Sequence, residues 1–205
     1  MKHLREILKK PSGSTVKKIP FRAILIEVIS VVLAVLVALA VDDWREARAN
    51  AKLAQETLTM IKTDLESNVT SLEDELKTHQ TILKELLETL EKVKKTGSME
   101  NITFNLNISF NPVVNQAAWQ TAIFTQAFRY MKPRTVQNIS AIYEMKELYN
   151  NQMLSAMKKV YSVNWDNKNI DYIFGQIMLF SQEVNMALKY GEELLKLEKG
   201  FLQPQ

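Results

Sequence analysis

Residues 23–46 read AILIEVISVVLAVLVALAVDDWRE, and this stretch decides how the rest of the chain is organised. Between Ala23 and Val41, nineteen consecutive residues contain a single charged side chain, that of Glu27. A helix needs about 20 apolar residues to cross the hydrocarbon layer of a bilayer. The stretch therefore predicts a transmembrane helix, which we place at residues 21–43.

A cleaved secretion signal is the alternative interpretation of the same stretch. Ala38 and Ala40 have the small-x-small spacing that signal peptidases prefer. However, the apolar run is longer than the ~7–15 residues of a typical signal, and the basic region before it is also long. We therefore expect the segment to be retained as a membrane anchor. If it were removed, the protein would instead be a secreted helical bundle.

The apolar run divides two parts of opposite charge. The part before Ala23 contains seven bases and one acid, whereas the part after Val41 contains nineteen bases and twenty-one acids. Basic residues favour the cytoplasmic side of a span. We therefore expect a basic cytoplasmic tail at residues 1–20, with the body of the protein on the other side of the membrane.

Four positions in and after the span are candidate membrane or interaction residues: Glu27, Asp42, Asp43 and Trp44. Trp44 falls where an indole ring can lie among lipid headgroups. A carboxylate within the bilayer is costly, so Glu27 either has a structural role, such as bonding a neighbouring helix, or handles protons or ions. It follows Arg22 by five residues, which places it roughly 7–8 Å inside at ~1.5 Å per residue, shallow enough to snorkel.

The segment resembles the membrane anchor of a family of uncharacterised bacterial single-span proteins. The family motif is a Glu, an aliphatic run ending in Ala-Leu, two Asn or Asp residues, Trp, Asn or Arg, and Glu. Its positions fall here on Glu27, Ala38, Leu39, Asp42, Asp43, Trp44, Arg45 and Glu46. The later segments AAWQTAIFTQAFRYM and SAIYE also resemble family blocks, although Ala34 and Ala40 stand where members often have Gly and Gln. The resemblance implies a bacterial inner-membrane, single-pass protein with a periplasmic body, and it implies no activity.

Apolar residues recur at spacings of three and four from Trp44 to Val93, which is typical of a helix with one packing face. We expect one long helix over residues 44–96, continuing out of the bilayer as a coiled-coil-like stalk. Gly97, preceded by lysines, suits the end of this helix. We expect the chain to form a homo-oligomer through the seam, and we interpret His79 as a seam residue.

The sequence NITFNLNISFNP changes the period from helical to alternating. We expect an extended connector at residues 97–111 with one apolar face, and we regard that face as a candidate contact surface. Its side chains are Ile102, Phe104, Leu106, Ile108 and Phe110. The segment either pairs with a strand of another copy, docks along helices of its own chain, or recruits a partner.

Residues 112–205 predict three further helices, separated at KPR (132–134) and NWDNKN (164–169). The first is apolar on most sides and carries Trp119, a further candidate contact residue. Short connections between successive helices favour antiparallel neighbours. The predicted fold class is therefore all-α, with a transmembrane helix that continues into a long helix and packs with an antiparallel up-and-down bundle.

The composition limits the chemistry that the chain can support. It contains no Cys and two His, and it has no Glu-x-x-His pair, phosphate-binding Gly loop or nucleophile motif. We therefore expect no enzymatic activity, cofactor or metal, and no nucleic-acid partner. The expected partners are the lipid bilayer, a second copy of the chain and an unidentified membrane protein.

The function that these features favour is a membrane-anchored helical protein with an extracytoplasmic interaction or scaffolding domain. The first alternative is a sensor-type domain that binds a small ligand and signals through a partner. The second is a membrane-perturbing effector whose spans oligomerise around Glu27.

Overall fold

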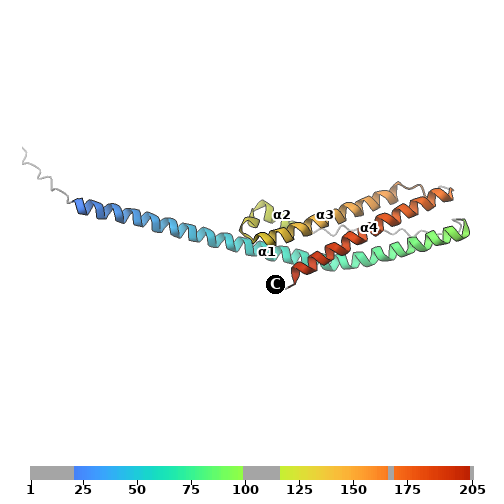
Figure 1. Cartoon of the computed structure of the whole chain (residues 1–205), viewed down its shortest axis with the longest axis horizontal. Coiled ribbons are helices and arrows are strands. Elements are labelled where there is room, and N and C mark those ends of the chain that lie inside the picture. Colours follow the sequence, from blue (N-terminus) through green and yellow to red (C-terminus); the bar gives the residue numbers. More distant parts are fainter. Residues whose placement is uncertain (1–20, 99–115, 166–168, 204–205) are drawn as a thin grey trace, which may run out of the picture. The chain divides into compact units, whose positions relative to one another are not determined.

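The computed structural model describes residues 21–98, 116–165 and 169–203 (Figure 1). Its helices are α1 (Phe21–Thr96), α2 (Ala117–Phe124), the 3-10 helix η1 (Ala127–Tyr130), α3 (Pro133–Ser162) and α4 (Ile170–Leu202). No strand occurs in these described ranges, and the all-α fold class is confirmed. The predicted apolar face of the connector (Ile102, Phe104, Leu106, Ile108 and Phe110) lies outside the described residues.

The chain divides into two compact units, residues 1–48 and residues 49–205, here called unit 1 and unit 2. Helix α1 contributes to both. In unit 1 the structure describes only the first part of α1. In unit 2 the rest of α1 packs with the C-terminal helices.

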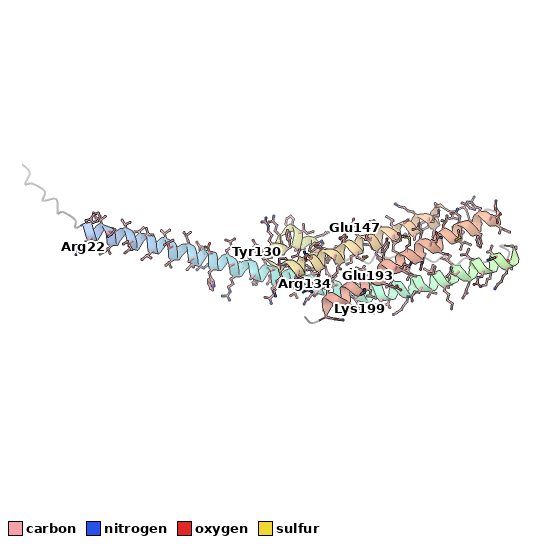
Figure 2. All side chains as sticks on the ribbon, in the orientation of Figure 1. Arg22, Tyr130, Arg134, Glu147, Glu193 and Lys199 are labelled. Atoms are coloured by element: carbon pink, nitrogen blue, oxygen red, sulfur yellow. The ribbon has the colours of Figure 1, made fainter. Side chains whose placement is uncertain are left out.

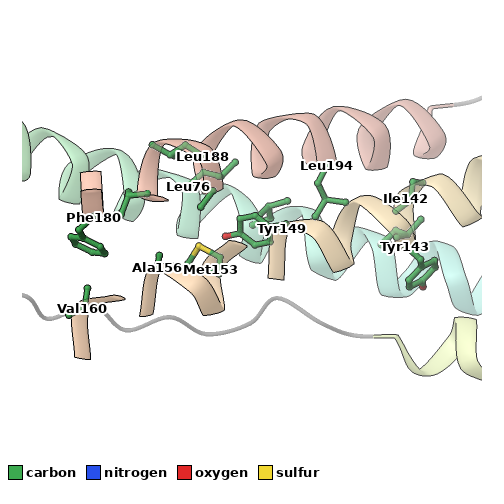
Figure 3. Packing of buried hydrophobic residues seen from close by; sticks show 14 of the residues in the cluster. Leu76, Ile142, Tyr143, Tyr149, Met153, Ala156, Val160, Phe180, Leu188 and Leu194 are labelled. Carbon is green, nitrogen blue, oxygen red and sulfur yellow. The ribbon is translucent and has the colours of Figure 1, made fainter. Parts of the chain in front are cut away.

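The core of unit 2 is built by α1, α3 and α4, with α2 packed beside them. Helices α3 and α4 are antiparallel neighbours, as their short connection predicts, whereas α1 and α3 run in the same direction (Figure 1). Leu76 of α1, Tyr149 of α3 and Leu188 of α4 belong to one buried cluster (Figure 3). Each large apolar side chain buried in this way stabilises the fold by about 1.5–3 kcal/mol.

The buried face of α1 follows the spacing of three and four that the sequence predicts. Its buried members are Ala54, Thr57, Ile61, Leu65, Asn68, Leu72, Leu76, His79, Leu86 and Val93. The chain's own C-terminal helices cover this seam, and Leu76 lies directly against Gly191 of α4. The expectation that a second copy covers the seam is therefore wrong for this stretch, because α3 and α4 bring matching apolar stripes on the same chain. Self-association itself stays a prediction.

Three of the buried seam residues are polar, and they recur every eleven residues: Thr57, Asn68 and His79. Eleven residues make three helical turns at ~3.67 residues per turn, close to the ~3.6 of a straight α-helix. A face with this repeat therefore stays turned toward its neighbours over many turns. This explains how a single helix can cover α3 and α4 along much of their length.

Local sequence sets most of the helix ends. Gly97 adopts a left-handed φ of 61°, and its N–H donates to the Val93 carbonyl, closing α1. Pro133 begins α3, where its missing N–H costs nothing. The Asn169 side chain accepts a hydrogen bond of 3.1 Å from the Tyr172 N–H and caps α4.

The helix predicted to continue to Met131 is interrupted, which corrects the expectation from sequence. Helix α2 ends at Phe124, and Gln126 takes a left-handed φ of 56° before η1 begins. The hydroxyls of Thr121 and Thr125 donate to carbonyls four residues earlier, an interaction that weakens helices slightly. A periodic apolar pattern does not reveal such a break, because the residues on both sides of it are apolar and Ala122 and Ala127 are both buried.

Candidate functional site: an exposed apolar helix and a charged core

The apolar part of α1 in unit 1 is covered by no other part of the described chain. Its most apolar window has a mean hydropathy of 3.1 and is 0% buried. Among the described residues this is the one helix long and apolar enough to cross a membrane. In water, such a surface would be strongly unfavourable, because exposed apolar area costs about 25 cal/mol per Å². The helix therefore fits a membrane anchor near the N-terminus.

The polar candidates of this segment lie along one helix and do not converge. Glu27, Asp42 and Asp43 are all exposed, and fifteen residues separate Glu27 from Asp42, about 22 Å along a helix. Trp44 is 60% exposed, and the Arg48 guanidinium lies 5.6 Å from its ring centroid. A cation in this position stabilises an indole by about 0.5–1 kcal/mol and suits a ring placed among headgroups.

Trp119 is the one predicted contact residue that the structure describes in unit 2. Its ring stacks on that of Tyr143, with centroids 5.2 Å apart and planes inclined by 11°. The neighbouring Ala118 N–H donates a 3.0 Å hydrogen bond to the Asp64 carboxylate of α1. Trp119 therefore helps to fix α2 on α3, and it is only partly available for a partner.

A buried ion pair joins α3 to α4 in the core of unit 2. Lys146 Nζ lies 3.7 Å from Glu198 Oε1, and both side chains are 0% exposed. Burial lowers the pKa of Lys146, and Glu198 and Asp64 oppose that change. Burial also raises the pKa of Glu198, opposed by Lys146. Because either charge alone would be stranded in an apolar environment, the pair ties the register of α3 to that of α4.

A second polar group is enclosed farther along the bundle. His79 Nε2 lies 3.9 Å from Glu75 Oε1 on the same face of α1, and the rings of His79 and Tyr149 are 6.4 Å apart. Burial raises the pKa of Glu75 to about 7, and the Tyr149 hydroxyl opposes part of the rise. Burial lowers the pKa of His79 to about 4. Both groups are therefore mainly uncharged in the folded protein at mildly acidic pH.

Neither enclosed group resembles a reaction centre. Lys146 and Glu198 are fully buried, and His79 is 1% exposed, so no substrate in solvent reaches them. Within the described ranges, His, Asp and Glu side chains form no group of three that could hold a metal ion. The Lys146–Glu198 pair links α3 to α4, and Glu75 and His79 of α1 lie beside Tyr149 of α3. Both groups therefore help to hold the helices together.

An open hollow of about 440 Å³ lies over α3 beside the Trp119 stack. Its lining residues are Gln116, Trp119, Ser140, Tyr143, Glu144, Glu147, Asn150 and Asn151. Pockets for small molecules are mostly apolar and enclose their ligands. This hollow is open and lined largely by amide, hydroxyl and carboxylate groups, and it does not favour the ligand-binding alternative.

The residues of the charged core were missed from sequence, although the sequence carries a signal for them. Lys146 occupies a position on the apolar stripe of α3 defined by Ile142, Tyr149 and Met153. Glu198 does the same on α4, in the stripe that includes Leu194. A charge at a core position of an amphipathic helix predicts an enclosed partner. Which oppositely charged residue is that partner depends on how the helices pack.

Comparisons of the chain with protein-family models, with curated proteins and with solved structures find no match. The resemblance to the single-span bacterial family therefore stays a prediction that rests on the motif between Glu27 and Glu46.

Proposed function

We propose that this protein is a single-pass membrane protein whose helical body, unit 2, serves as an interaction domain outside the cytoplasm. The exposed apolar helix of unit 1 carries the proposal, because a bilayer is the environment that satisfies such a surface. The excess of bases before the span favours a cytoplasmic N-terminus. In the bacterial setting implied by the family resemblance, unit 2 then lies in the periplasm.

A role in protein contact, rather than in catalysis, is supported by where the functional groups lie. Four titratable side chains whose pKa is shifted by burial, Lys146, Glu198, Glu75 and His79, are enclosed between helices. Large apolar side chains, in contrast, remain on the outside of unit 2. On α4, Leu179 is 39% exposed and Met186 is 44% exposed.

Leu179 and Met186 are seven residues apart and so lie on one face of α4. That face, and not the α1 seam, is the surface through which we propose that two copies associate. Methionine suits such a surface because its unbranched thioether adapts to different neighbours.

Topology and association can be tested on the same protein. We expect the full chain to resist alkaline extraction from membranes, and unit 2 to be digested by protease in spheroplasts. Because the chain has no Cys, a single Gln182→Cys between Leu179 and Met186 should crosslink two copies in membranes. Ser155→Cys, exposed on α3, is the matched control. Protection of unit 2 from protease would contradict the topology, and a strict monomer at both positions would contradict self-association.

A further inference from the structure

Helices α2 and η1 show an unusual division between buried and exposed side chains. The residues they bury are small: Ala118, Ala122 and Ala127, each at most 2% exposed. Three of their large apolar residues point outward instead, with Phe124 90% exposed, Ile123 50% and Tyr130 46%. These elements therefore attach to the bundle through alanines and the Trp119 ring, and they present Phe124 and Tyr130 to the surroundings.

The backbone fixes this outward presentation. The left-handed Gln126 separates α2 from η1, so Phe124 and Tyr130 lie on either side of a defined turn. The Asp64 carboxylate holds the first turn of α2 through the Ala118 N–H. Because α2 is held at its start and packed through Ala122, the exposure of Phe124 is a property of the folded domain rather than of a frayed end.

The same stretch of unit 2 carries charge of one sign only. From Ala117 to Tyr143 the chain contains three bases, Arg129, Lys132 and Arg134, and no acid. All three bases are exposed. Figure 2 labels Tyr130 and Arg134 at the end of unit 2 that carries α2 and the start of α3. Aromatic and cationic side chains thus occur together at this end of unit 2, with no acid in the same stretch of chain.

We propose that this surface, made of Ile123, Phe124, Arg129, Tyr130, Lys132 and Arg134, docks on the anionic lipid headgroups of the membrane that anchors the chain. We call it the α2–η1 surface. The inference rests on the proposed membrane anchoring. Apolar and aromatic groups flanked by Lys and Arg are the composition with which proteins enter a headgroup layer.

Because the anchor already holds the chain in the membrane, even a modest affinity of the α2–η1 surface for lipid headgroups is sufficient for docking. Five residues along the chain separate Trp44, at the end of the span, from Ala49, where unit 2 begins. A bilayer that holds the span therefore keeps unit 2 near its surface. Asp64, which holds the first turn of α2, follows Trp44 by twenty residues of α1, about 30 Å along a helix, so α1 must tilt toward the membrane plane for the α2–η1 surface to reach the headgroups. Three cations near an anionic surface favour contact on the order of a hundredfold, and salt weakens that preference. A protein partner would need matching acids, whereas an anionic bilayer presents them everywhere.

The test uses the full chain in vesicles and a fluorophore at one introduced cysteine. An environment-sensitive dye on Thr125→Cys, exposed beside Phe124, reports contact with lipids that carry a nitroxide at the headgroup. Ser155→Cys on α3 is the matched control position. We expect strong quenching at position 125 in vesicles containing phosphatidylglycerol, weaker quenching in phosphatidylcholine alone or at high salt, and little at position 155.

Charge reversal tests whether quenching at position 125 depends on the bases of the α2–η1 surface or on bases elsewhere in the domain. Arg129→Glu, Lys132→Glu and Arg134→Glu together should reduce quenching at position 125 to the level of position 155. Reversal of two other exposed bases, Lys158→Glu and Lys189→Glu, should leave quenching unchanged. Since all of these side chains are exposed, both variants should fold, which circular dichroism checks.

The outcomes distinguish the docking from the anchor. If the protein floats with the vesicles, the anchor is in place. Equal quenching at positions 125 and 155, or quenching at position 125 that the charge reversal does not change, would then overturn the α2–η1 proposal. If the dye at position 125 becomes protected from quenching as protein density rises, and lipid charge has no effect, the surface contacts a second copy. That result would also overturn the proposal. Failure of the full chain to float with vesicles would contradict the membrane anchoring itself.

Discussion

Gly191 of α4 gives the sharpest test of how the helices of unit 2 pack. A Cβ added at this position would lie 2.5 Å from Leu76 Cδ2 of α1 and 3.0 Å from Tyr149 Cε2 of α3. Tyr149 is 0% exposed and Leu76 is 5% exposed, so neither has open space into which it can move. The missing side chain at Gly191 therefore makes room for the side chains of Leu76 and Tyr149 against α4.

Two opposing effects determine the result of Gly191→Ala. Replacing Gly by Ala inside a helix stabilises it by about 1 kcal/mol. Adding a methyl group to a filled core costs about 1–3 kcal/mol, and the contacts here are close enough to require the upper part of that range. We expect a net destabilisation of about 1–2 kcal/mol, which corresponds to a fall of roughly 2–8 °C in Tm for a domain of this size.

Gly175 and Gly200 provide matched controls on the same helix. A Cβ at either position would meet nothing within 4 Å. Gly175→Ala should therefore show only the helix-propensity gain of about 1 kcal/mol. The measurement is thermal and urea denaturation of the full chain in detergent micelles, followed by circular dichroism. If Gly191→Ala proves as stabilising as Gly175→Ala, the three helices do not approach one another as described.

Three further predictions concern the charged groups of unit 2. Glu198→Leu should destabilise the fold by about 3–5 kcal/mol because it strands the Lys146 charge, and adding Lys146→Met should recover most of the loss; a double variant no better than the single one would contradict the pairing. Glu75 has a raised pKa of about 7, so it binds a proton more tightly in the folded state, and its contribution to stability is complete below pH ~4.5 and lost as pH rises through about 7. Glu75→Gln should therefore gain stability relative to the natural chain as pH rises across that window, whereas a difference independent of pH would show that the carboxyl is not enclosed. Asp64→Ala removes the acceptor of the Ala118 N–H and should cost about 1 kcal/mol, measured by denaturation, with exposed Asp74→Ala as the control that should cost less.

The sequence predicted the helices well because their signals are local. The apolar run after Arg22, the Gly97 stop, Pro133 and the period of α1 each depend on a few neighbouring residues. Amphipathic stripes on α3 and α4 likewise reveal which side of each helix is buried. The interruption at Gln126 was missed, because a left-handed residue between two apolar segments changes the direction of the chain without changing its pattern.

Partner choice could not be predicted in the same way. The seam of α1 is equally suited to a second copy or to helices of its own chain, and only the folded structure shows α3 and α4 on it. The outward position of Phe124 was also hidden, since an apolar residue in an apolar helix suggests burial. Such contacts join residues far apart in the chain, so they depend on which elements meet.

Residue order alone therefore determined that this protein has one strongly apolar helix, a charge difference across it and a body made of amphipathic helices. These properties follow from side-chain hydrophobicity and helical periodicity, which act over a few turns. Only the tertiary structure decided that Lys146 meets Glu198, that Gly191 lies against Leu76 and Tyr149, and that α2 attaches through alanines and Trp119 with Phe124 outside. The physical reason is that close packing and charge pairing act between helices, and their geometry is fixed only when the helices are assembled.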